Sequence, residues 1–158
     1  MLIAYQRLEK HMLADDLKTL LATEYALSIK AQFFHWNVEG PDFAQLHEFF
    51  GNFYEEVYDN SIDKIAEYIR SLDDYSPGSF ERFVELSAIA GQTKVPRARL
   101  MLEELLADTL LSIDLLNHCF ESAEQENQQG IANFIAERLD AMAKHAWMLR
   151  SFLKENRA

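Results

Sequence analysis

Hydrophobic residues recur every three or four positions along four long stretches of the chain. These stretches cover residues 8–35, 43–72, 97–124 and 131–154. This spacing is typical of helices that bury one face against a common core. In the first stretch, Glu24 stands where the spacing calls for an apolar side chain. Four long helices of this period predict an all-α fold built as a four-helix bundle.

The apolar stripe of the second stretch changes phase near its middle. Its first half follows Leu46, Phe50, Phe53 and Val57, and its second half follows Ile62, Ile65, Ile69 and Leu72. The step from Val57 to Ile62 is five residues, where a helix needs three or four. Either the buried face rotates gradually, or one extra residue is absorbed as a π-bulge. Because burying each displaced isoleucine is worth roughly 1.5–3 kcal/mol, we predict at least one i→i+5 hydrogen bond between Val57 and Ile62.

The connections between the stretches differ in length. Gly40 and Pro41 form a turn signal in the short first connection. The connection between the second and third stretches holds about 24 residues, more than adjacent antiparallel helices need. Residues 80–90 within it predict a short amphipathic helix. We find no internal repeat, and the 158 residues predict a single domain over residues 1–158.

Composition narrows the class of protein. The formal net charge of −11 argues against binding of nucleic acid through the general surface, because such affinity comes largely from basic side chains. An acidic surface either serves solubility or attracts cations. The single Cys119 cannot form an intrachain disulfide, which favours the reducing cytoplasm. No apolar stretch reaches membrane-spanning length, and the first residues lack the pattern of a signal peptide.

Two places in the sequence could carry metal chemistry. His35 and His47 flank the short turn, so both imidazoles can lie at one end of the bundle. Asp63 and Glu67 are four residues apart and therefore share a helix face. Imidazole and carboxylate together suit iron, although such histidines also serve as helix caps and such acidic pairs are also found on solvated faces. The other histidines have no paired carboxylate at a convincing sequence spacing: His11, His118 and His145.

Several segments together resemble the Dps miniferritins of the ferritin-like superfamily. They are HWNVEGPDFAQLHE at 35–48, DKIAEYIR at 63–70, SAIA at 87–90 and KHAWMLR at 144–150. The resemblance covers nearly the whole chain. It implies the ferritin-like four-helix bundle, with a short helix in the long crossover between the second and third long helices.

The resemblance also implies a function, an assembly and a site. Dps proteins form hollow dodecamers that oxidise Fe(II), preferentially with hydrogen peroxide, and store the ferric mineral, which protects the cell from oxidative damage. Their ferroxidase site lies at a twofold interface, where His35 and His47 match histidines of one subunit. Asp63 and Glu67 match carboxylates of the other subunit. Trp36 matches the tryptophan beside this centre, a position equally suited to an aromatic residue of the interface.

The sequence departs from the family pattern at three points. Gly51 stands where an acidic ligand is common, so one of the two iron positions is expected to be weak or empty. The spacing from His47 to Asp63 is one residue longer than usual, in agreement with the phase change described above. Residues 127–133 are amide-rich where aspartates usually line the pores that admit iron, and Asn133 replaces one of them. The alternative function is a dodecameric shell with weak or absent ferroxidase activity, serving as a metal-sequestering or DNA-associated structural particle. DNA binding itself is not expected, because neither end of the sequence carries a polybasic run.

Overall fold

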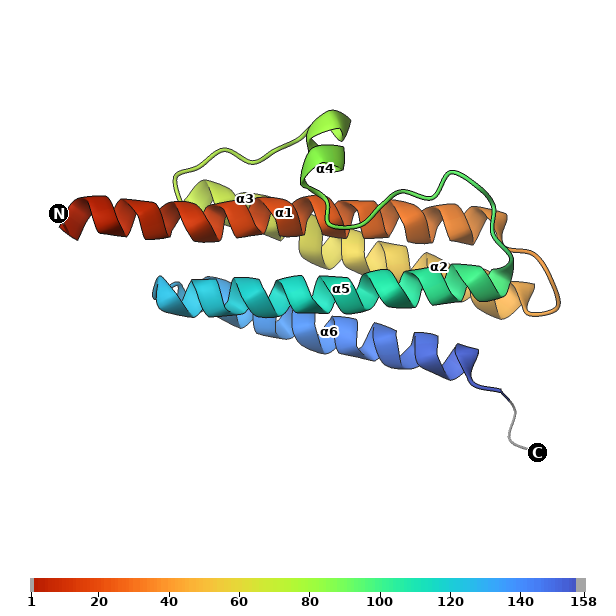
Figure 1. Cartoon of the computed structure of the whole chain (residues 1–158). Helices are drawn as coiled ribbons and strands as arrows, with labels where there is room; N and C mark the ends of the chain where they lie inside the picture. The colour runs from red at the N-terminus through yellow and green to blue at the C-terminus, as the bar shows by residue number, and fades with distance from the viewer. Residues whose placement is uncertain (1, 156–158) are drawn as a thin grey trace.

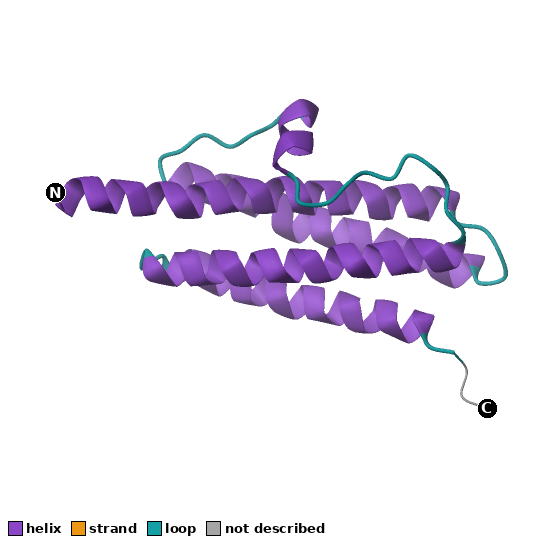
Figure 2. Ribbon diagram, in the orientation of Figure 1, coloured by secondary structure: helices purple, strands orange, loops and turns teal. Residues whose placement is uncertain are grey.

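The computed structural model describes residues 2–155, with side chains from residue 12 onward. The elements are α1 (Leu2–Asn37), α2 (Phe43–Val57), the π-helix η1 (Tyr58–Ile62), α3 (Asp63–Ser71), α4 (Phe80–Leu86), α5 (Ala98–Gln125) and α6 (Gln129–Leu153). Residues 2–155 contain no strand (Figure 2). The predicted all-α four-helix bundle with a short crossover helix is therefore confirmed.

The order of the helices follows from the long crossover. α1 lies antiparallel to α2 and α3, and α5 lies antiparallel to α6 (Figure 1). The crossover carries the chain back along the bundle, so that α5 begins near the end where α2 begins. Its short helix α4 packs against α1 and is capped by the Ser79 hydroxyl, which accepts a hydrogen bond from the Arg82 N–H at 3.3 Å.

The helix predicted over residues 80–90 ends at Leu86, four residues early. Ser87 adopts an extended backbone with ψ of 135°, and its hydroxyl donates to the Ile89 carbonyl at 3.0 Å. A serine side chain that bonds to nearby backbone offers an alternative to helical bonding, and here that alternative prevails.

The π-helix η1 confirms the predicted break in the second helix. Its five residues restore the phase between the two apolar halves, so Val57, Ile65 and Ile69 are all fully buried. Ser61, inside the π-helix, is buried as well, and its hydroxyl donates to the Glu24 carboxylate at 3.1 Å. The bulge therefore both aligns the core and directs a polar side chain into it.

The buried face of α5 differs in part from the predicted one. The apolar spacing in the sequence predicts a buried stripe of Leu102, Leu106, Thr109, Ile113, Leu116, Phe120 and Ala123. Of these, Leu102, Thr109, Leu116 and Ala123 are buried. The positions between them are filled by residues one place earlier than predicted, namely Leu105, Ser112 and Cys119, while Leu106, Ile113 and Phe120 are half-buried. Hydrophobicity favoured Ile113 over Ser112, but Ser112 turns inward to donate to Glu24. Among the described residues, no helix is both long and apolar enough to cross a membrane.

Candidate metal centre

The turn between α1 and α2 brings His35 and His47 into contact. The Val38 N–H donates to the Phe34 carbonyl at 2.9 Å and completes α1. The chain then reverses at Gly40, whose φ of +117° is open to glycine and strained for other residues. The Phe43 N–H donates to the Gly40 carbonyl at 3.1 Å as α2 begins. The two helices are thereby held side by side at the position of the two histidines.

The two histidines orient each other through the backbone. The Nδ1 atom of His35 lies 2.6 Å from the His47 carbonyl oxygen, and the Nδ1 atom of His47 lies 2.7 Å from the His35 carbonyl oxygen. Because a carbonyl oxygen only accepts, both Nδ1 atoms carry the proton. With Nδ1 engaged as the donor, Nε2 is the atom of each ring that is left to bind a metal ion, which is the arrangement of a metal-binding histidine.

Neighbouring side chains and Gly51 fix the two rings. The imidazoles of His35 and His47 stack with centroids 3.9 Å apart, and the Phe43 ring also stacks with His47, at a centroid distance of 5.1 Å. Tyr54 meets His35 edge to face at 5.5 Å. A Cβ atom at position 51 would lie 3.0 Å from both Cε1 and Nδ1 of His35. Gly51 therefore leaves the space that the His35 ring needs, a role that the sequence alone did not reveal.

Asp63 and Glu67 lie apart from the histidines of the same chain. Both carboxylates are exposed on α3, and neither forms a hydrogen bond or ion pair with another described residue. Asp63 borders a surface hollow of about 440 Å³ together with Asp59 and Glu137. Asp63 lies sixteen positions after His47 along the helix, a rise of about 24 Å. Accordingly, the described residues of one chain contain no group of three or more potential metal ligands placed to hold an ion.

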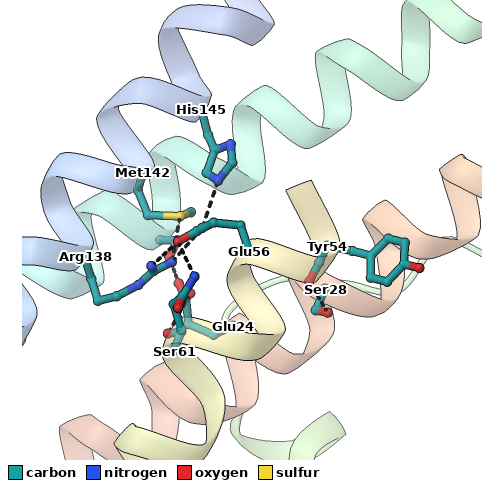
Figure 3. Close-up of polar contacts among 10 residues, drawn as sticks. Glu24, Ser28, Tyr54, Glu56, Ser61, Arg138, Met142 and His145 are labelled. Atoms are coloured by element: carbon teal, nitrogen blue, oxygen red, sulfur yellow. Dashed lines mark hydrogen bonds and ion pairs between the residues drawn. The ribbon is translucent and has the colours of Figure 1, made fainter. Parts of the chain in front are cut away.

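A second polar cluster lies at the centre of the bundle (Figure 3). Both terminal nitrogens of Arg138 donate to Glu56, one of them to Oε2 at 3.1 Å. Nε2 of His145 donates to the same Oε2 atom at 2.9 Å. Glu24 is fully buried and accepts hydrogen bonds from the hydroxyls of Ser61 and Ser112. Side chains from α1, α2, η1, α5 and α6 thus form two hydrogen-bonded groups, and the charge of Arg138 acts on the glutamates of both.

The two glutamates of this cluster have opposite pKa shifts. Burial raises the pKa of Glu24, and the hydrogen bonds from Ser112 and Ser61 and the charge of Arg138 offset only part of that rise. Burial would also raise the pKa of Glu56, but the hydrogen bonds from His145 and Arg138 outweigh it and lower the pKa to about 2. Glu56 is therefore the ionised member of the cluster, held by a guanidinium and an imidazole.

Two histidines judged to lack a carboxylate partner do have one. His145 contacts Glu56, and Nε2 of His118 lies 3.2 Å from Oδ2 of Asp16. In both cases the partner comes from a different helix, so sequence spacing could not show it. The side chain of His11 lies outside the described residues.

Comparisons with known proteins agree with the fold. A family model described as the ferritin-like domain matches residues 14–158. The chain is 37% identical over 136 residues to an uncharacterized low temperature-induced protein of Nostoc, covering 85% of this chain and 75% of that protein. It is 32% identical over 132 residues to DNA protection during starvation protein 2 of Bacillus anthracis, covering 82% of this chain and 88% of that protein.

A solved structure gives the same result. The Dps protein from Vibrio cholerae, described as a member of a broad superfamily of ferritin-like diiron-carboxylate proteins, superposes with a TM-score of 0.87 at 25% identity. The match covers 92% of this chain and 91% of that one. The chain belongs to the ferritin-like family. Within that family it is a Dps protein.

Proposed function

We propose that this protein oxidises Fe(II) with hydrogen peroxide and stores the ferric product inside a hollow dodecamer. The observation that carries the proposal is the pair of stacked imidazoles, each with Nδ1 bound to a carbonyl and Nε2 left to accept a metal ion. His35 and His47 of this protein would bind Fe(II), for which imidazole is a suitable ligand. Each peroxide molecule accepts two electrons, one from each of two Fe(II) ions, and two protons from solvent, so that its O–O bond breaks and two water molecules form.

The proposal includes assembly because one chain carries two separated half-sites. Asp63 and Glu67 would complete the centre of a twofold-related chain, whose hard carboxylate oxygens favour the Fe(III) product. Exposed apolar side chains support a second contact surface that another chain would cover in the assembly. Trp36 is 66% exposed, Phe80 is 74% exposed and Val84 is 80% exposed. They border an apolar hollow of about 620 Å³ between α1, α4 and the segment that follows. Apolar surface of this kind marks an interaction site.

The acidic surface supports the storage part of the proposal. With a formal net charge of −11 per chain, a closed shell would attract Fe(II) and oppose the approach of anions. The alternative is a shell with weak ferroxidase activity, because Gly51 supplies no carboxylate at the histidines. These two functions differ in the number of irons that bind tightly at each centre.

Anaerobic titration with Fe(II), followed by peroxide, tests the proposal. We expect saturable tight binding at each centre in the wild type, rapid oxidation on addition of peroxide, and loss of both in His47→Ala. The matched control is His118→Ala, which removes an exposed histidine whose partner is Asp16 and should change neither. Two tight irons per centre favour the efficient ferroxidase, whereas one or none favours the weakly active shell. Equal behaviour of the His47→Ala and wild-type proteins would refute the assigned site.

DNA protection is a second candidate function, because the relative from Bacillus anthracis is named for it. We propose that this chain does not bind DNA directly, since its net charge of −11 is multiplied over the shell. A mobility-shift assay at about 150 mM salt should show no complex. A shift that persists in the presence of a chelator would contradict this expectation.

A further inference from the structure

Glu24 lies on the buried face of α1, at a position where the apolar spacing calls for a hydrophobic side chain. It is 0% exposed, and its two oxygens contact the hydroxyls of Ser112 and Ser61. Both partners are neutral, and a serine hydroxyl can either donate to a carboxylate or accept from a carboxylic acid. These contacts therefore suit either form of Glu24, whereas burial without a cation in contact disfavours the ionised form. The function proposed above gives this residue no role.

The charged and titratable groups that face Glu24 come from the neighbouring helices (Figure 3). α2 contributes Glu56, and α6 contributes Arg138 and His145. α5 contributes the thiol of Cys119, which stays neutral because burial raises its pKa to about 12. The guanidinium of Arg138 makes a forked contact with Glu56, so its hydrogen bonds to a carboxylate go to Glu56 and not to Glu24. Arg138 and Glu56 therefore balance each other, and Glu24 is left without a cation of its own.

The imidazole of His145 does not supply that cation. Its Nε2 atom donates to Glu56 at 2.9 Å, whereas its Nδ1 atom is buried and has no hydrogen-bond partner among the described residues. A charged imidazolium would carry an N–H at Nδ1, and an unmet buried donor on a charged group is especially costly. The neutral ring leaves only a lone pair at that atom. The centre therefore holds one balanced ion pair, a neutral imidazole and Glu24.

Electrostatics at the centre agrees with this geometry. Burial raises the pKa of Glu24 above its ordinary value, and the hydrogen bonds from Ser112 and Ser61 and the charge of Arg138 offset only part of that rise. We propose that Glu24 holds a proton at neutral pH, so that the bundle centre carries no net charge, and that loss of this proton in alkaline solution loosens the contact between α1, η1 and α5. Ser61 passes the change to the π-helix, which directly precedes Asp63. This device needs no metal ion and is therefore independent of the ferroxidase proposal.

Equilibrium unfolding of the full-length assembled protein tests the proposal, with the wild type and Glu24→Gln compared at equal chain concentration over a range of pH. The unfolded chain releases the Glu24 proton near pH 4.5, the ordinary value for a glutamate, whereas the folded chain keeps it to a higher pH. As the pH rises, the folding equilibrium constant of the wild type should therefore fall relative to that of Glu24→Gln. The fall should reach about tenfold per pH unit and end when the folded group has ionised.

Glu56→Gln is the matched control, because it makes the same substitution on the glutamate whose pKa is lowered to about 2. It leaves the buried charge of Arg138 without its partner, and near neutral pH it should lower the folding equilibrium constant by roughly 100-fold or more. Glu24→Gln should instead fold and assemble as the wild type does, because the amide has the shape and the charge of the acid form.

Infrared spectroscopy in heavy water detects the proton itself, which a change in packing alone would not remove. At neutral pH the wild type should show the C=O band of a protonated carboxylic acid that Glu24→Gln lacks. Glu121→Gln, at an exposed position on α5, should keep this band. A band that Glu24→Gln shares with the wild type, parallel pH profiles of the two proteins, or a Glu24→Gln chain that fails to fold would each overturn the proposal.

Discussion

Replacing Gly51 with aspartate should weaken Fe(II) binding at the histidines, although it adds a carboxylate at a position where acidic ligands are common in related proteins. We expect the loss in affinity to be roughly 10- to 100-fold, the range found when the groups that orient a metal ligand are disturbed. Anaerobic titration of Gly51→Asp and wild type with Fe(II) measures it. The physical reason is steric: a Cβ at position 51 would lie 3.0 Å from two atoms of the His35 ring.

The displaced ring cannot easily find another position. His35 is held by the His47 carbonyl through Nδ1, by the stacked His47 ring and by the edge of Tyr54. Moving it by a few tenths of an ångström strains the hydrogen bond and the ring contacts that orient it. Gly51→Ala should therefore weaken binding as well, because the Cβ atom alone causes the clash. Asn52→Asp, which adds the same charge at the exposed neighbouring position, is the matched control and should bind iron as wild type does. Tighter binding by Gly51→Asp would show that the acidic ligand matters more than the position of the ring.

The long helices and the bulge could be predicted because both depend on local apolar spacing. The five-residue step from Val57 to Ile62 had one low-cost solution, since a straight helix would have exposed one of two apolar stripes. The π-helix at Tyr58–Ile62 is that solution. The inward turn of Ser112 in place of Ile113 was not predictable, because it depends on Glu24, which lies on another helix. A partner that is distant in sequence leaves no periodic signal.

The same limit applies to the candidate site. The short turn between the first two helices was enough to place His35 and His47 together, since few residues separate them. Their hydrogen bonds go to backbone carbonyls, which every residue carries, so no side-chain pattern could indicate them. The pairing of Glu56 with Arg138 and His145 joins helices far apart in the chain and was missed for the same reason as Ser112. The assignment of Asp63 and Glu67 to a centre shared between chains stays a prediction.

Co-assembly of two inactive variants should restore ferroxidase activity to about one quarter of the wild-type value, if each centre is shared across a twofold interface. One variant carries His35→Ala and His47→Ala, and the other carries Asp63→Asn and Glu67→Gln. Each alone should lose nearly all peroxide-driven oxidation. In a random equal mixture, about half of the twofold pairs contain one chain of each kind. In such a pair, one centre combines both defects and the other combines both intact halves.

A centre built within one chain predicts a different result, because no mixture of the two variants would then contain an intact centre. Mixing either variant with wild type should give about half of the wild-type activity, whether the centre is shared between chains or built within one chain. This mixture therefore checks that co-assembly itself does not reduce activity. Light scattering should show particles of about twelve times the 18.3 kDa chain, and mass spectrometry should confirm that both chains are present in them. We expect the shared centre because His47 and Asp63 of one chain are separated by about 24 Å of helix. Mixed particles that stay inactive would contradict it.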